Sequence, residues 1–333
     1  EFRRVLFRSL RGDMKSLPRF AAAVFVVVLA GYWLCLPVAW GQRSPGSEPQ
    51  TGQKSGEGQK PTPAKPPVKS SEAPGPESKE AKAALNQARQ RLLSHPSIQA
   101  KLVETVALTN RRFTINGSYL QGGDGELKLR LEYQAKLGDT EGSVLEVCDG
   151  QVLWSRNQIG TDVRISRRDV RQILQAAAEN GLPNNLITVE LGFGGLPGLL
   201  ASIEQSMLFD RYKEETVDGR TQIVIEGGWK PHMLKLWQGT NPEAPLPDYV
   251  PSRIRVYLDG ESYFPSRIWY LGRNADQTLR RKVSLEFSEV ETGIAIPASK
   301  FKFVPPDGVF PEDLTPVFIE QIKKRQQARE IKK

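Results

Sequence analysis

Alternating apolar and polar residues cover much of the chain between residues 113 and 305, and this pattern predicts an antiparallel sheet. From Leu127 to Tyr133 every second residue is apolar, and the residues between them are charged. Successive side chains of a strand point to opposite faces, so this strand has one apolar and one polar face. The stretch 113–120 is joined to it by the glycine-rich residues 122–125, which predicts a hairpin with one face in water.

Further hairpins are predicted along the chain. Asp149-Gly150 is a turn signal between two strand patterns in residues 143–156. Residues 249–258 and 263–271 are nearly identical on either side of Asp259-Gly260, which favours neighbouring strands of one hairpin. Other strands are predicted at 221–227, 282–290 and 300–305. About ten strands with short turns indicate a large meandering sheet.

Two helices are predicted before the first strand. Ser78 is a suitable N-cap for a helix that ends before Pro96, with Ala81, Leu85, Ala88 and Leu92 on its apolar face. A second helical piece is predicted over 97–110.

Two more helices are predicted in the middle of the chain. The segment 166–181 begins at Ser166, a possible N-cap, and ends at Asn180-Gly181, a typical C-cap. The segment 195–207 follows a glycine-rich apolar stretch, which suits either a packed core or the cover of a hydrophobic opening. Its apolar stripe consists of Leu196, Leu199, Leu200, Ile203 and Met207.

The stretch FKFVPPDGVFPEDL, residues 301–314, combines a strand pattern with a stop. Pro305-Pro306 offer no backbone N–H, so they are expected to end the last strand at the edge of the sheet. Val309-Phe310 then return apolar side chains, which we expect to fold back against the rim of the sheet.

The N-terminal quarter differs in composition from the rest. Residues 1–13 precede the first methionine and are interpreted as upstream, non-native translation. Residues 14–41 have the layout of a signal peptide, with a basic start, an apolar run and small residues before Gln42. An uncleaved inner-membrane anchor over residues 20–40 is the alternative, because the apolar run is long enough to span a bilayer. Residues 42–78 are rich in Pro, Gly, Ser and Lys and are predicted to be a disordered linker.

The positive charge lies at the two ends of the chain. Of the net +8, residues 1–41 carry +4 and residues 320–333 carry +4, so the body between them is neutral. A neutral body gives no support to a nucleic-acid-binding protein. The folded domain is predicted over 79–318, followed by a basic C-terminal helix over 319–333 that is either solvated or in contact with a partner.

No motif of catalytic strength occurs in the sequence. The chain has two histidines, His95 and His232, and both are expected in loop or capping positions. Cys148 is expected to be a buried strand residue, since Cys35 lies in the signal segment and leaves it without a disulfide partner. No metal-ligand spacing is present. We therefore expect neither an enzyme nor a cofactor nor a metal.

Three stretches carry a resemblance to a known family: VCDGQVLWSR, YFPSRIWYLGRN and FKFVPPDGVF. The matching residues are Asp149, Gly150, Leu153, Trp154, Pro265, Ile268, Phe301, Pro305, Pro306, Gly308 and Val309. In these motifs and their order, residues from about 80 to 315 resemble the periplasmic lipoprotein-carrier (LolA-like) superfamily, with the outer-membrane lipoprotein receptor and the sigma-factor regulatory protein. The chain departs from that pattern by an insertion at 227–250, by the basic C-terminal helix, and by having no match for the carrier's lid-locking arginine.

The resemblance implies a mainly β fold with helices (α+β), namely an incomplete, strongly curved antiparallel β-barrel whose apolar hollow is covered by helices and binds acyl chains. From the alternating strands and the helix 195–207 we predict the residues that line the hollow and its cover. They are Leu129, Leu131, Trp154, Leu199, Leu200, Ile203, Ile268, Leu285 and Phe287. The alternative is that these side chains fill each other's space as an ordinary core.

The function predicted from the sequence is a periplasmic or otherwise extracytoplasmic carrier of lipids or of lipoprotein acyl chains. The alternative is an envelope sensor that uses the same fold to bind a protein partner. We expect a monomer that binds no nucleic acid.

The position of the mature N-terminus tests the prediction that residues 14–41 are a cleaved signal peptide. N-terminal sequencing of the protein from the cell envelope should begin at Gln42. Retention of Met14 or Lys15 would instead establish the membrane-anchored form.

Overall fold

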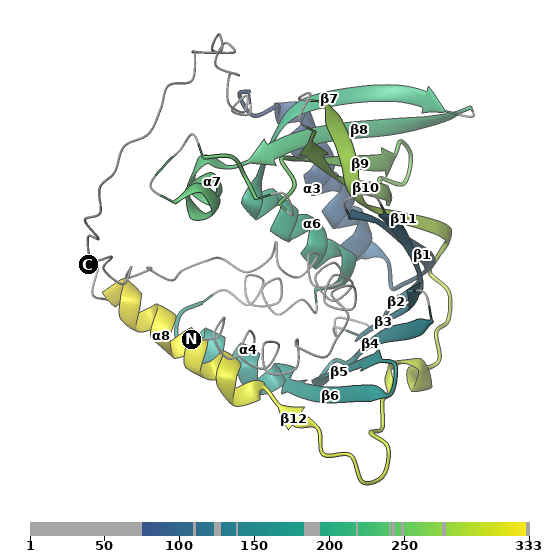
Figure 1. The fold of residues 1–333 in the computed structure, drawn as a ribbon, viewed down its shortest axis with the longest axis vertical. Helices are drawn as coiled ribbons and strands as arrows, with labels where there is room; N and C mark the ends of the chain where they lie inside the picture. Colours follow the sequence, from purple (N-terminus) through teal and green to yellow (C-terminus); the bar gives the residue numbers. More distant parts are fainter. Residues whose placement is uncertain are drawn as a thin grey trace, which may run out of the picture.

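The structure, a computed structural model, describes residues 75–330 with short gaps at 109–110, 123–127, 138, 183–193, 218, 240, 242–243, 248–249 and 275–277 (Figure 1). The predictions for 1–13, 14–41 and most of 42–78 lie outside the described residues. Within the described ranges, no helix is both long and apolar enough to cross a bilayer.

Twelve strands form one sheet in the order β12-β6-β5-β4-β3-β2-β1-β11-β10-β9-β8-β7. The first half consists of β1 (Ser97–Leu108), β2 (Arg111–Gly122), β3 (Lys128–Leu137), β4 (Thr140–Asp149), β5 (Val152–Ile159) and β6 (Asp162–Asp169). The second half consists of β7 (Met207–Val217), β8 (Arg220–Trp229), β9 (Arg253–Asp259), β10 (Pro265–Arg273) and β11 (Leu279–Thr292). β12 (Glu312–Asp313) runs parallel to β6, and all other neighbouring strands are antiparallel.

The sheet bends into an open arc whose two edges are β12 and β7 (Figure 1). Register shifts interrupt the pairs β1–β11, β10–β11, β9–β10 and β7–β8. An extra residue in one strand bends it and increases the local twist, so these bulges favour curvature in the second half of the sheet. The predicted fold class, an incomplete antiparallel barrel with helices, is confirmed.

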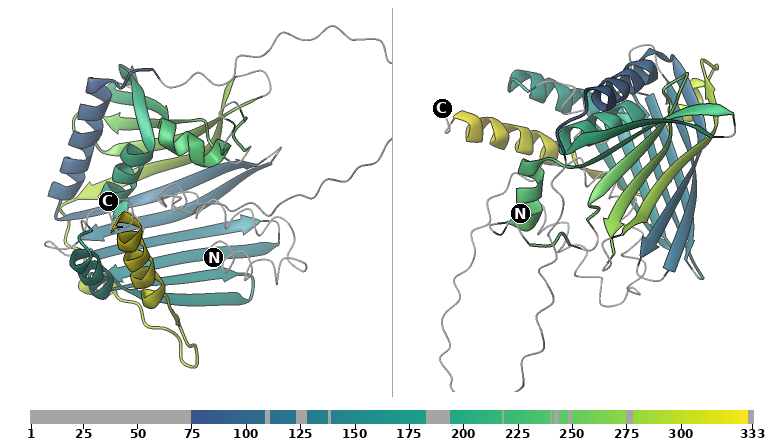
Figure 2. Two further views of the ribbon diagram at one scale, coloured as in Figure 1. Left: turned by 90° about the vertical axis from the view of Figure 1, so that its left-hand side faces the viewer. Right: turned by 90° about the horizontal axis from the view of Figure 1, so that it is seen from above.

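The helices lie on the concave side of the sheet in separate groups (Figures 1 and 2). α3 (Lys79–Ser94) and α6 (Gly195–Ser206) pack against each other and against β7, and α3 also contacts β8. α4 (Val170–Glu179) and α8 (Thr315–Glu330) pack together beside β6. The two groups therefore cover opposite ends of the arc.

Four of the predicted helices are present as α3, α4, α6 and α8, and one of them has a different N-cap. Ser78 caps α3 by accepting a hydrogen bond from the N–H of Ala81. α4 ends at Asn180 as predicted, but its N-cap is Asp169, whose side chain accepts from the N–H of Gln172. Ser166 lies in β6 instead, because the strand continues to Asp169 before the helix begins.

The helix predicted over 97–110 is wrong, since Ser97–Leu108 form strand β1. Ile98, Leu102 and Val106 are buried and four residues apart, which fits one face of a helix and also one face of a strand. Ala100 and Glu104, which lie between them on the strand, are buried as well. Because Glu104 is polar, it interrupts the apolar–polar alternation that would have predicted a strand.

The strand predicted over 300–305 is also wrong. A short 3-10 helix, η1 (Ala298–Phe301), is followed by a segment without strand pairing. The chain leaves β11 in the middle of the sheet and joins β12 at its edge, so it has to cross the intervening strands instead of running along them. Phe310 is 94% exposed, so Val309-Phe310 do not fold back against the rim.

The structure refines two further predictions, the start of the C-terminal helix and the position of His232. α8 begins at Thr315, before the predicted start of the C-terminal helix. His232, expected in a loop, lies in the first turn of α7 (Pro231–Gln238), where Pro231 occupies the N1 position that suits proline.

The N-cap of α4 provides a stability test. Asp169→Ala should lower the free energy of unfolding by about 1 kcal/mol, because the N–H groups at the start of the helix lose their acceptor. Ser166→Ala is the matched control and should cost much less in urea denaturation. A larger loss for Ser166→Ala would contradict the assigned cap.

Candidate functional site

The concave face of the sheet can be traced from strand to strand by its register. Residues directly opposite each other in antiparallel strands project to the same side. One such row consists of Ile225, Val256, Ile268, Leu285, Glu104, Ile115 and Ala135. The hydroxyl of Tyr119 accepts a hydrogen bond from the N–H of Leu196 in α6, which identifies this side as the helix-covered one.

Most of the predicted lining residues lie on this face. Leu129, Ile268 and Leu285 are buried, and Leu131 and Phe287 are half-buried against the same hydrophobic cluster. From α6, Leu200 and Ile203 are buried and Leu199 is half-buried in the same cluster. The sheet and α6 thus contribute to one continuous apolar region.

Trp154 lies on the other face of the sheet. Its register partners are Val147 and Arg167, whereas Leu153 pairs with Cys148 on the concave side. A shift of one residue changes the face in a strand, so Leu153 is the inward residue of this pair. The ring of Trp154 contacts Phe303, 5.7 Å away between centroids, in the segment that crosses the convex face.

A buried carboxyl group interrupts the apolar concave face at its centre. Glu104 is 3% exposed and lies directly between Ile115 of β2 and Leu285 of β11. Burial raises the pKa of this carboxyl to about 8. Among the described residues, neither a hydrogen-bond donor nor a cation contacts it.

Tyr133 and Tyr270 lie on the same face as Glu104, in opposite halves of the sheet. Tyr133 lies over Gly117 of β2, where a Cβ atom would come within 3.0 Å of its Cδ1. Burial raises the pKa of the Tyr133 hydroxyl well above its usual value, and the negative charges of Glu104 and Tyr270 add to the rise. The Tyr133 hydroxyl therefore lies within electrostatic range of both Glu104 and Tyr270.

A second polar cluster lies at the β6 end of the concave face. The Arg168 guanidinium donates to the Ser155 hydroxyl at 2.5 Å and lies 3.4 Å from the Glu146 carboxylate. Burial raises the pKa of Glu146, and Arg168 and Ser155 only partly offset the rise. Arg168 also lies over the ring of Phe318, with 5.9 Å between its Cζ and the centroid. This cluster therefore links the sheet to α8.

The covering helix α6 is held at both ends. At its start, Gly195 has a positive φ of 57° and lies so close to the Tyr119 hydroxyl that a Cβ atom would come within 2.5 Å. Further along, the Glu204 carboxylate forms an ion pair with Arg89 of α3, and its backbone carbonyl accepts from Lys230 at 2.6 Å. Neither Tyr119 nor Glu204 was predicted from the sequence to anchor this helix.

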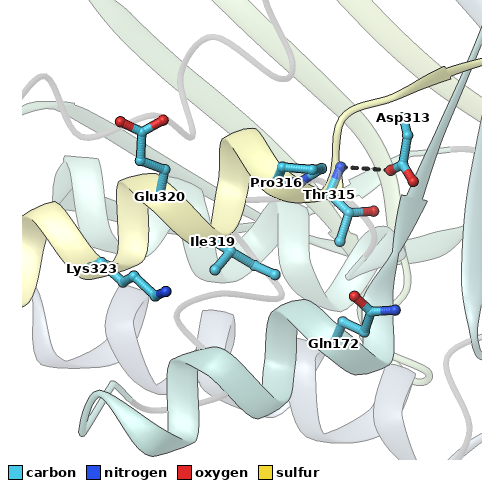
Figure 3. Close-up of a pocket in the computed structure, with 7 residues that line it drawn as sticks. All are labelled: Gln172, Asp313, Thr315, Pro316, Ile319, Glu320 and Lys323. Carbon is cyan, nitrogen blue, oxygen red and sulfur yellow. Dashed lines mark hydrogen bonds between the residues drawn. The ribbon is translucent and has the colours of Figure 1, made fainter.

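A groove of about 360 Å³ lies between α4 and α8 (Figure 3). Gln172, Asp313, Thr315, Pro316, Ile319, Glu320 and Lys323 line it. The Asp313 carboxylate already accepts hydrogen bonds from the Thr315 N–H and from Arg167. Hydrogen bonding to Thr315, together with Arg167, lowers the pKa of Asp313. The Asp313 carboxylate is therefore already occupied at the start of α8. This groove is the weaker candidate for a ligand site.

The described residues offer little for catalysis. They contain no group of three or more His, Cys, Asp or Glu residues placed to hold a metal ion. Cys148 is buried, and burial raises the pKa of its thiol to about 11, which disfavours the nucleophilic thiolate. The concave face, an apolar surface with a few inward polar groups, is therefore the candidate site, and its composition suits binding.

No protein-family model and no curated protein matches the sequence. Similar solved structures include MucB, at 15% identity and a TM-score of 0.34, over 69% of this chain and 65% of MucB. LprF from Mycobacterium bovis is 12% identical with a TM-score of 0.36, over 67% of this chain and 98% of LprF. The Mycobacterium tuberculosis lipoprotein LppX is 12% identical with a TM-score of 0.34, over 66% of this chain and 100% of LppX.

These similarities concern the fold alone. The identities are at most 15% and the TM-scores lie below 0.5. The similarity therefore carries no conclusion about ligand or partner, and the function has to be derived from the residues of this chain.

The buried Glu104 predicts an unusual pH dependence of stability. The folded state keeps the proton up to a pKa of about 8, whereas the unfolded state loses it near 4.5. The stabilisation is thus complete below the lower value and is lost as pH rises through the higher one. Between about pH 5 and pH 8, Glu104 should lower the free energy of unfolding by up to about 1.4 kcal/mol per pH unit.

Urea denaturation of the wild type and of Glu104→Gln over this pH range measures the effect. The variant cannot ionise at this position, so its free energy of unfolding should decline less steeply with pH. The slopes of other groups cancel in the difference between the two proteins. Parallel curves would show that Glu104 ionises in the folded state as it does in the unfolded chain.

Proposed function

We propose that the protein is an exported envelope protein that binds a hydrophobic ligand on the concave face of its sheet. The ligand class is a lipid or the acyl chains of a lipoprotein, and the binding involves no catalysis. In this proposal the hollow is the region between the concave face of the sheet and α6, which the ligand would occupy.

One observation carries the proposal: apolar side chains from strands of both halves of the sheet converge on one face of an open arc. Leu129 and Leu131 come from the first half, and Ile268, Leu285 and Phe287 from the second. The helices that cover this face pack mainly at the two ends of the arc. An acyl chain along the central strands would extend the apolar contacts of these residues.

The energetics of acyl-chain burial are sufficient. Each buried methylene contributes about 0.8 kcal/mol, so a chain of about sixteen carbons contributes roughly 12 kcal/mol before ordering is subtracted. Losses of translational, rotational and side-chain freedom take several kcal/mol of this. The remainder corresponds to micromolar binding or tighter.

The competing interpretation is a packed core, in which the same residues contact only each other. Leu200, which is fully buried, suits both interpretations, and a charge there would unfold the domain in either case. Leu131 distinguishes them better, because it is half-buried on the concave face of β3. Leu145 of β4 is a matched control, since it is half-buried on the convex face.

Binding of a fluorescent fatty acid to the wild type, Leu131→Gln and Leu145→Gln tests the proposal. We expect Leu131→Gln to weaken binding by about five- to tenfold, the effect of losing one to two buried methylenes and adding a polar group. Leu145→Gln should bind like the wild type, although both variants lose similar stability. Absence of wild-type binding at micromolar concentrations, or equal weakening in both variants, would refute a ligand in the hollow and favour the protein-binding alternative.

A further inference from the structure

The cluster around Glu104 lies where the two halves of the sheet meet. Glu104 belongs to β1, the first strand of one half, and its neighbour Leu285 belongs to β11, the last strand of the other. Tyr133 reaches this seam across Gly117, and Tyr270 lies on the same face beyond Val283. Polar groups from both halves therefore lie beside the seam on one apolar face.

The isolation of Glu104 needs an explanation. A buried carboxyl group is normally paired with a cation or satisfied by hydrogen bonds. Leu102 and Val106, its neighbours on the same face of β1, are apolar and buried, as are Ile115 and Leu285 on either side. A leucine at position 104 would complete this surface, so the carboxyl group adds nothing to the packing of the sheet.

We propose that the Glu104 carboxyl and the Tyr133 hydroxyl form a polar subsite that binds the carbonyl oxygen of an acyl ester. This inference rests on the proposed function, because it assigns the position of the ligand's polar group within the hollow. At neutral pH the carboxyl group is largely protonated, since burial raises its pKa to about 8. Both groups then carry an O–H donor, and a carbonyl oxygen can accept from both.

Two O–H donors in an apolar surface favour an ester over an alkane and over an amine. An alkane would leave both donors unsatisfied when it displaces water from them. An ammonium group would require the ionised carboxylate, which burial disfavours. An ester carbonyl is neutral and accepts hydrogen bonds without bringing a charge into the apolar surface.

Two probes with the same number of carbon atoms, methyl palmitate and heptadecane, isolate the polar contribution. Each is delivered from cyclodextrin and displaces the fluorescent fatty acid from the full chain. The wild type should prefer the ester by about five- to tenfold, the range expected for satisfying buried hydrogen-bond donors. Glu104→Leu should reduce this preference to about one without weakening heptadecane binding. Glu104→Gln should keep much of it, because its amide N–H also donates.

Two further variants complete the experiment. Glu286→Leu is the matched control, because Glu286 is adjacent to Leu285 but faces the convex side, where its partners are Val103 and Arg267. It should keep the wild-type preference. Tyr133→Phe removes only a hydroxyl, so it should reduce the preference even if Glu104→Leu fails to fold.

The outcomes separate this inference from the proposed function. Equal wild-type affinity for ester and alkane, or an unchanged preference in the foldable variants, overturns the polar subsite while fatty-acid binding stands. Tighter binding of hexadecylamine than of the ester also overturns it and assigns the carboxylate to an ammonium group. Failure of all probes and of the fatty acid overturns the subsite and the hollow together.

Discussion

The pairing of β1 with β11 is the constraint on which the rest of the structure depends. Apart from β12, each half of the sheet is a meander whose neighbouring strands follow one another in the sequence. Only β1 and β11 join the halves within the sheet, through pairs such as Leu102 with Phe287 and Glu104 with Leu285. Closing a loop of this length costs chain entropy before any contact compensates for it, so we expect this seam to form late in folding.

The seam also determines which residues face the concave side. Because side chains alternate along a strand, fixing one pair across β1 and β11 fixes the inward residues of both halves. The bulge between Gln99 and Lys101 lies in this same pair, and Glu289 of β11 adopts a positive φ of 50° beside it. The extra residue bends the sheet where its two halves join, which places the helix groups on one concave side.

The sequence predicts local elements well where a single period fits the residues. The hairpin around Asp149-Gly150 and the repeated strands around Asp259-Gly260 are present as predicted, and their turns are formed by residues suited to them. The segment 97–108 was misassigned because a spacing of four suits both a helix and a strand. The path of residues 298–311 could not be predicted, since it depends on β12 joining the far edge of the sheet, a contact that no local pattern encodes.

The same limit explains which parts of the candidate site were found. Apolar lining residues such as Leu129 and Ile268 follow from alternation alone, whereas Trp154 was placed one residue out of phase beside Leu153. Glu104 was hidden by the helical reading of β1, although a strand reading would have placed it among inward apolar residues. A charged residue in phase with a buried face is a stronger pointer to function than the apolar residues around it, because packing alone does not account for it. In this protein that residue lies at the seam, where a ligand that contacts it would also touch both halves of the sheet.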